Sequence, residues 1–392
     1  MNIFKFKYNI LLFLICFNFL IPSYFTWILS EYEMIDLFQS IISIILMVIL
    51  IWKNTINLSF PLFWLVVQYV ILIVSSYMNH GSTYTAIINS TLVVALCMTL
   101  DVIVRDERKV IVFLSLVRDI VLLFFFINIL FTIIMPNGIP GFSSASTPYF
   151  LYGNMNTTVK YVFPGLCCSM LLDSRVGKKM SVYSFLFFVG MLYLCLEVYF
   201  MATAFIGMLF VFLWLLFKSL FNRYLRSCYV GIIIIVFIVE IFIVISFGYS
   251  SIALLISDLF GKDITFSGRA LLWQQMLYAI QSNPILGYGL RDSDYVRSLV
   301  GISAGAHNYY LDLSFQRGLV GLASFLSIFI YILVKLKNKN GDIYLLLGFV
   351  GAYLLMFISE PFYFTEKFHM PVIYILAVLL SDKKRKSNVS KG

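Results

Sequence analysis

The sequence is poor in charged residues, which make up only 12% of its 392 positions. An average soluble domain is about a quarter charged, and disordered chains combine low hydrophobicity with high net charge. The sequence also lacks the regular alternation of polar and apolar residues that the strands of an outer-membrane barrel require. These absences exclude a soluble enzyme, a disordered chain and an outer-membrane barrel.

Cysteine motifs and internal repeats are missing as well. The six cysteines lie within or beside apolar runs, and none forms a CxxC pair. We interpret them as small buried hydrophobic residues, which imply no disulfide framework and no metal cage. The absence of a visible internal repeat weakens an interpretation as an inverted-repeat transporter.

Apolar residues, in contrast, make up 61% of the chain, and the mean hydropathy is +0.95. A membrane-spanning helix needs about 20 predominantly apolar residues. The apolar runs predict an all-α polytopic membrane protein with about twelve transmembrane helices. Their centres lie near Phe17, Ile44, Val67, Val94, Ile127, Leu166, Val189, Phe210, Ile238, Ser327, Gly351 and Ile375.

The net charge of +9 indicates how the chain is oriented. With both termini in the cytoplasm, 21 of the 28 lysines and arginines fall on cytoplasmic segments and 7 on external ones, as the positive-inside rule requires. This topology predicts three regions. They are a bundle of about nine spans at 1–247, one large external helical loop that carries the chemistry at 248–317, and C-terminal transmembrane helices with a basic cytoplasmic tail at 318–392.

The first half of the large loop predicts a helix that begins near Ser267 and stops at Pro284. Its apolar residues are spaced at i, i+3, i+4 and i+7, which is typical of an amphipathic helix that lies on a membrane surface. These residues are Trp273, Met276, Leu277 and Ile280. Arg269 falls in the first turn, where free N–H groups favour an anion, and its guanidinium is a candidate phosphate or diphosphate clamp. The alternative is an arginine that contacts lipid headgroups.

The second half of the loop carries two glycines and a histidine. Gly287 and Gly289 predict a tight turn or a close approach of the backbone, and they are a weak phosphate motif. A helix begins near His307, with Gly318 near its end or at a kink. An imidazole in a first helical turn is favoured in its neutral form and can act as a general base; the alternative is a structural histidine. Arg317, about 15 Å further along a straight helix, serves a different contact.

These residues carry a resemblance. The pattern Ser267-Gly268-Arg269, Trp273, Pro284-Ile-Leu-Gly287-Tyr288-Gly289, His307-Asn308 and Gly318-Leu-Val-Gly321 resembles the core of the O-antigen polymerase/ligase superfamily (Wzy and WaaL types). The resemblance implies a glycosyltransferase of the C-type fold class in the bacterial inner membrane, acting on undecaprenyl-diphosphate-linked sugars without metal or cofactor. It implies that His307 and Arg269 are catalytic. Candidate diphosphate- or substrate-binding residues are Arg291, Asn308, Tyr309, Tyr288, Gly287 and Gly289.

One departure from the family's pattern bears on the activity. Members, ligases especially, often carry an arginine in the region that corresponds to 201–207, and this sequence has none there. If the family's arginine holds the diphosphate, Arg291, Arg297 or Lys160 takes over that role in this chain. The departure favours a polymerase over a ligase.

The expected reaction joins lipid-linked repeat units into O-antigen or capsular polysaccharide. A ligase that transfers polymer to a lipid A core and a flippase for lipid-linked oligosaccharides are the alternatives. The expected partners are the lipid-linked substrates, membrane lipids, and flippase and chain-length regulator proteins, with no nucleic acid. Glu240 lies inside the ninth predicted span and is a functional candidate for that reason; the alternative is that it pairs with a neighbouring helix. Other carboxylates are rival bases, namely Asp292, Asp294, Asp312, Glu31, Glu33 and Asp36.

Overall fold

The computed structural model describes residues 3–28, 34–53, 59–143, 148–198, 201–246, 269–301, 306–336, 341–362 and 365–381. These residues are helical apart from turns and one short antiparallel hairpin, β1 (Tyr149–Phe150) with β2 (Gly153–Asn154). The helices are α1 (Ile3–Leu20), α2 (Ser23–Ile28), α3 (Met34–Trp52), α4 (Phe60–Met78), α5 (Thr83–Ile103), α6 (Glu107–Ile134), α7 (Met155–Val176), α8 (Val182–Tyr193), the π-helical turn η2 (Leu194–Val198), α9 (Ala202–Leu216), α10 (Lys218–Arg223), α11 (Leu225–Ser246), α13 (Arg269–Ser282), α14 (Ser293–Val300), α15 (Tyr309–Lys335), α16 (Gly341–Met356) and α17 (Glu366–Ser381).

The helices confirm a polytopic membrane protein. Five of the described helices are long and apolar enough to cross a membrane, namely α4, α5, α6, α11 and α15. Four shorter apolar stretches lie in α3, in α8 with η2, in α9 and in α16. Each of the twelve predicted centres falls inside a helix, the remaining three in α1, α7 and α17.

Local sequence signals set the ends of α7. Asn154 caps its first turn, because the Asn154 side chain accepts a hydrogen bond from the backbone N–H of Thr157 at 2.9 Å. At the other end Gly177 adopts the left-handed conformation that commonly closes a helix. The helix is therefore anchored between the hairpin β1–β2 and the turn into α8.

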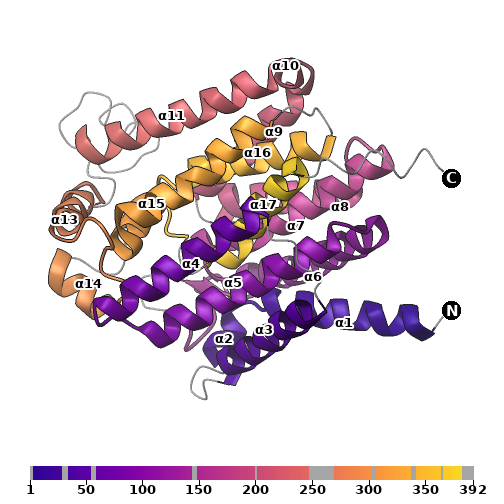
Figure 1. The fold of residues 1–392 in the computed structure, drawn as a ribbon. Helices are drawn as coiled ribbons and strands as arrows, with labels where there is room; N and C mark the ends of the chain where they lie inside the picture. The colour runs from indigo at the N-terminus through magenta and orange to yellow at the C-terminus, as the bar shows by residue number, and fades with distance from the viewer. Residues whose placement is uncertain are drawn as a thin grey trace.

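The bundle has two distinct ends. At one end, Arg175 of α7 pairs with Glu107 at the start of α6 and with Asp342 at the start of α16, the latter at 2.7 Å. At the opposite end lie α13 and α14, beside the last turns of α4 and the first turns of α15 (Figure 1). The first residues of α1 point away from α13 and α14 (Figure 1). The described residues of the predicted external loop, 269–301 and 306–317, thus gather at one end of the bundle (Figure 1).

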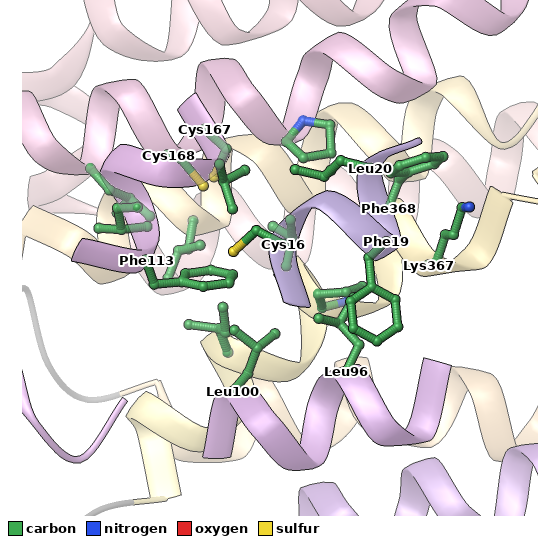
Figure 2. A pocket seen from close by; sticks show the side chains of 18 residues that line it. Cys16, Phe19, Leu20, Leu96, Leu100, Phe113, Cys167, Cys168, Lys367 and Phe368 are labelled. Atoms are coloured by element: carbon green, nitrogen blue, oxygen red, sulfur yellow. The ribbon is translucent and has the colours of Figure 1, made fainter. Parts of the chain in front are cut away.

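A small apolar cavity of about 70 Å³ lies between α1, α5, α6, α7 and α17. Cys16, Cys167 and Cys168 contribute to its wall, and Lys367 stands at the opposite end from these cysteines (Figure 2). All six cysteines are free thiols and five of them are buried. Their role as small hydrophobic packing residues agrees with the sequence interpretation.

Candidate active site

The loop helix α13 packs on protein, so the prediction that it lies on a membrane surface is wrong. Its apolar face is buried in a small second core shared with α14 and the first turns of α15. Periodicity shows that one face of a helix is apolar, and it does not show what covers that face. The buried residues of this core are Leu272, Trp273, Met276, Ala279, Ile280, Val296, Val300, Ala306, Leu311 and Phe315.

Helix α15 is broken at Gly318, which confirms the predicted kink. Gly318 has φ 62° and ψ −171°, a backbone conformation that is essentially restricted to glycine. The amides of Leu319 and Val320 donate to the carbonyls of Pro284 and Ile285 at 2.7 and 3.3 Å, in place of partners within the helix. The preceding segment, residues 309–317, is fully buried. The part of the predicted external loop nearest α15 is therefore enclosed by the bundle.

The strap, which we define as residues 284–291, fills this break. Tyr288 N–H donates to the carbonyl of Phe315 at 2.7 Å, and Gly289 N–H donates to that of Gln316 at 3.0 Å. Both strap glycines have positive φ, 67° for Gly287 and 71° for Gly289. A Cβ on Gly287 would lie 2.3 Å from the Phe315 oxygen. The predicted close backbone approach is confirmed. Both glycine amides are bonded within the chain, so neither is free to hold phosphate.

Arg291 fastens the strap to the turn between α4 and α5. Its guanidinium donates to the carbonyl oxygens of Tyr288 (3.1 Å), His80 (2.9 Å) and Asn79. It also stacks over the ring of Tyr295, 4.0 Å from the centroid. The geometry therefore gives Arg291 a positioning role, with three of its five N–H donors in use.

Tyr288 is half-buried and stacks on Phe315 with ring centroids 4.8 Å apart. Its hydroxyl donates to the carbonyl of Ala279 at 3.0 Å. Partial burial, together with the nearby Tyr295, raises the pKa of Tyr288 above its ordinary value. The phenol is accordingly a hydrogen-bond donor that ties the strap to α13.

His307 lies in a turn that is fixed on both sides. The carbonyl of Ala306 accepts from Trp273 Nε1 at 2.7 Å, and the amide of Ala306 donates to Asp312 Oδ1 at 2.7 Å. His307 itself has φ 49°, a left-handed conformation that is uncommon for a residue with a side chain. It precedes the N-cap of α15, so its predicted place in the first helical turn is wrong by two residues. Strained backbone held by its surroundings is typical of functional sites.

Asn308 joins this turn to the membrane-embedded acid Glu240. The side-chain oxygen of Asn308 caps α15 by accepting from Leu311 N at 3.0 Å, and its Nδ2 donates to Glu240 Oε1 at 2.7 Å. The second oxygen of Glu240 is buried and has no hydrogen-bond partner within the described residues. Asn308 is fully buried, so both of its side-chain groups serve contacts within the protein. The sequence marked Glu240 as an intramembrane acid but gave no partner for it.

Tyr309 points away from His307 into the bundle. Its hydroxyl donates to Glu366 Oε1 at 2.7 Å, and Arg317 Nη2 donates to both oxygens of Glu366 at 2.7 and 2.8 Å. Arg317 and Tyr309 are 1% and 0% exposed. The predicted substrate contact by Tyr309 is replaced by a structural one, and Arg317 serves a different contact, as expected.

The other charged candidates have partners of their own. Lys160 lies inside α7, where it pairs with Glu360 at 3.8 Å and donates to the carbonyl of Pro361. Arg297 pairs with Asp294 at 3.9 Å on the surface. Asp292 caps α14 by accepting from Tyr295 N at 2.7 Å. The side chains of Arg269, Glu31, Glu33 and Asp36 lie outside the described residues.

The backbone places the start of α13 near the histidine turn. Arg269 is the first residue of α13, and it precedes Trp273 by four residues, one helical turn along the same face. Trp273 is the residue that donates to Ala306, directly before His307. The structure thus brings together three separate segments, the first turn of α13, the histidine turn and Glu240 of α11. In the described part of the chain no cluster of histidine, cysteine or acidic residues has the composition of a metal site.

Comparison with known families identifies the region that holds this site. Residues 183–326 match the Wzy_C family, which is described as O-antigen ligase. The match runs from α8 into α15 and includes the strap, the histidine turn and Gly318. Comparisons with curated proteins and with solved structures gave no match. Wzy_C members are glycosyltransferase-like ligases and polymerases of lipid-linked polysaccharide assembly in the bacterial inner membrane. Residues 183–326 of this multi-pass membrane protein are therefore similar to the Wzy_C O-antigen ligase/polymerase domain.

Proposed function

We propose that the protein is a polymerase that joins undecaprenyl-diphosphate-linked repeat units into O-antigen or capsular polysaccharide. The observation that carries the proposal is the histidine turn, in which Trp273, Asp312 and Asn308 hold His307 in a left-handed conformation inside the matched segment. The proposal includes twelve spans, a C-type glycosyltransferase fold and cytoplasmic termini. The positive-inside rule supports this orientation, because the chain beside Arg175 at that end of the bundle carries Arg105, Arg108 and Lys109 around the start of α6 and Lys178 and Lys179 after α7.

The proposed reaction has one displacement. A hydroxyl of the acceptor repeat unit loses its proton to the imidazole of His307, and its oxygen forms a bond to the anomeric carbon of the donor glycan. The bond from that carbon to the diphosphate oxygen breaks, and undecaprenyl diphosphate leaves. Negative charge grows on the leaving group, so a cation at the start of α13 stabilises the transition state. Arg269 takes this role.

The structure supports a division of roles among the remaining candidates. Asn308 and Glu240 orient the turn that carries His307, and Arg291 holds the strap beside α15. Asp312 is a weaker candidate base, because Oδ1 already accepts the Ala306 amide. The match to an enzyme family favours this reaction over transport by a flippase.

The surface glycan of a deletion strain tests the proposal. Loss of a polymerase leaves single repeat units on the acceptor, whereas loss of a ligase leaves polymer on the lipid carrier. Complementation with His307→Ala or Arg269→Ala should give the polymerase-loss pattern, with normal amounts of protein in the membrane. Polymer of near-normal length with both variants would contradict the mechanism, and polymer trapped on the carrier would favour the ligase.

A further inference from the structure

A second cavity, of about 560 Å³, includes Glu366, the partner of Tyr309, in its wall. Its wall is formed by α2, α3, α5, the hairpin β1–β2, the start of α7 and the start of α17. The hairpin and the first turn of α17 lie at the same end of the bundle as α15's first turn, since Tyr309 contacts Glu366 and Lys160 contacts Glu360. Its volume is in the range of small-molecule sites.

The lining of this cavity combines polar side chains with apolar surface. Hydroxyl and amide side chains dominate it, with Glu366 and Lys367 as its charged members. Glu366 is already neutralised by Arg317 on the protein side. A wall of this kind offers hydrogen-bond donors and acceptors beside apolar surface, which suits a ligand rich in hydroxyl groups.

Two features indicate a preformed binding surface. Gly153 (φ 95°) stands where a Cβ would come within 3.0 Å of the hydroxyls of Ser23 and Thr157, so the hairpin and α2 meet closely. The Asn89 amide lines the cavity, is half-buried, and makes no side-chain hydrogen bond within the described residues. Asn89 therefore has donor and acceptor groups available for a ligand.

Besides hydrogen-bonding groups, the cavity wall carries an aromatic side chain, which is a second feature typical of sugar-binding sites. Tyr149 lines the same cavity and is half-buried, whereas Tyr152, also in the wall, is fully buried and stacks on Tyr161 with ring centroids 4.7 Å apart. Tyrosine presents an apolar ring face together with a polar hydroxyl. Such a combination fits a pyranose ring, which has both apolar C–H faces and hydroxyl edges.

We propose that this cavity binds the sugar portion of the acceptor, a single lipid-linked repeat unit. The inference rests on the proposed polymerase function. A volume of about 560 Å³ accommodates a few sugar residues and not a long polymer. Only the first turn of α15 separates it from the histidine turn, because Tyr309 reaches Glu366 in its wall while the neighbouring Asn308 reaches Glu240.

The test is a binding titration with the purified full-length protein in detergent. The probe is the mixture of short oligosaccharides released from the host's own surface glycan by mild acid. Asn89→Leu should weaken binding about tenfold or more, because it removes both a donor and an acceptor. Asn137→Leu is the matched control, since Asn137 is exposed, lies outside the cavity and should bind as the unaltered protein does. Asn89→Gln keeps the amide and should retain part of the affinity. This result would show that the loss in Asn89→Leu is not caused by misfolding.

His307→Ala separates this inference from the proposed function. It should bind the oligosaccharides normally while failing to extend chains. Equal binding by the Asn89→Leu variant and the unaltered protein, or no binding by the unaltered protein, would overturn the cavity assignment alone. Normal chain extension by His307→Ala would instead overturn the proposed function, whatever the binding result.

Discussion

Gly318→Ala tests whether the strap and the broken helix α15 form one rigid unit. The backbone conformation at Gly318, φ 62° and ψ −171°, costs about 1–3 kcal/mol for any residue with a side chain. An added Cβ would lie 2.0 Å from the oxygen and 2.3 Å from the carbonyl carbon of Ile285, and 2.6 Å from the nitrogen of Leu286. All three atoms belong to the backbone, so the strap itself must move. Such overpacking adds about 1–3 kcal/mol.

The expected loss of stability is therefore about 2–6 kcal/mol, the sum of the two terms. Gly177→Ala is the matched control, because Gly177 also has positive φ (73°), while a Cβ there would meet nothing within 4 Å. This control should lose only about 1–2 kcal/mol. Thermal unfolding in detergent, followed by tryptophan fluorescence, measures both variants. Equal shifts of the unfolding midpoint for the two variants would refute the close contact between strap and helix.

Three further predictions concern polar contacts. Glu366→Ala leaves Arg317 buried and unpaired, so unfolding in detergent should show a loss of about 3–5 kcal/mol; an unchanged midpoint would contradict the buried pair. Glu240→Ala removes the acceptor for Asn308 and should lower the rate of chain extension about tenfold. The side-chain oxygen of Glu240→Gln can still accept this hydrogen bond, so this variant should retain most of the rate. Equal losses of rate in the two variants would contradict the hydrogen-bond role of Glu240. Trp273→Phe removes the hydrogen bond to the carbonyl before His307 and should slow extension with a stability loss of only about 1 kcal/mol; unaltered extension would contradict the positioning role.

Local signals in the sequence predicted the helices well. Apolar runs located the centre of each of the twelve predicted spans within a helix. Pro284 correctly predicted where α13 stops, and Gly318 correctly predicted a kink. These features depend on residues close together in the chain, where periodicity, proline and glycine act directly on the backbone.

Contacts between distant segments were not predictable in the same way. Glu240 is 68 residues from Asn308, and Arg317 is 49 residues from Glu366. A hydropathy profile shows each of these residues as an isolated polar group, because the profile carries no information on which helices are neighbours. The buried role of Tyr309 was missed for the same reason.

The central claim is that His307 is the base for glycan transfer. Its most direct test is chain extension by purified protein with lipid-linked repeat units extracted from the host, comparing His307→Ala with His80→Ala. His80 is an exposed histidine that also has positive φ (56°). The two variants therefore replace a histidine with similar backbone strain, but only His307 lies in the proposed active site. The account predicts no detectable polymer with His307→Ala and normal polymer with His80→Ala. Polymer formation by the folded His307→Ala protein at the normal rate would contradict it.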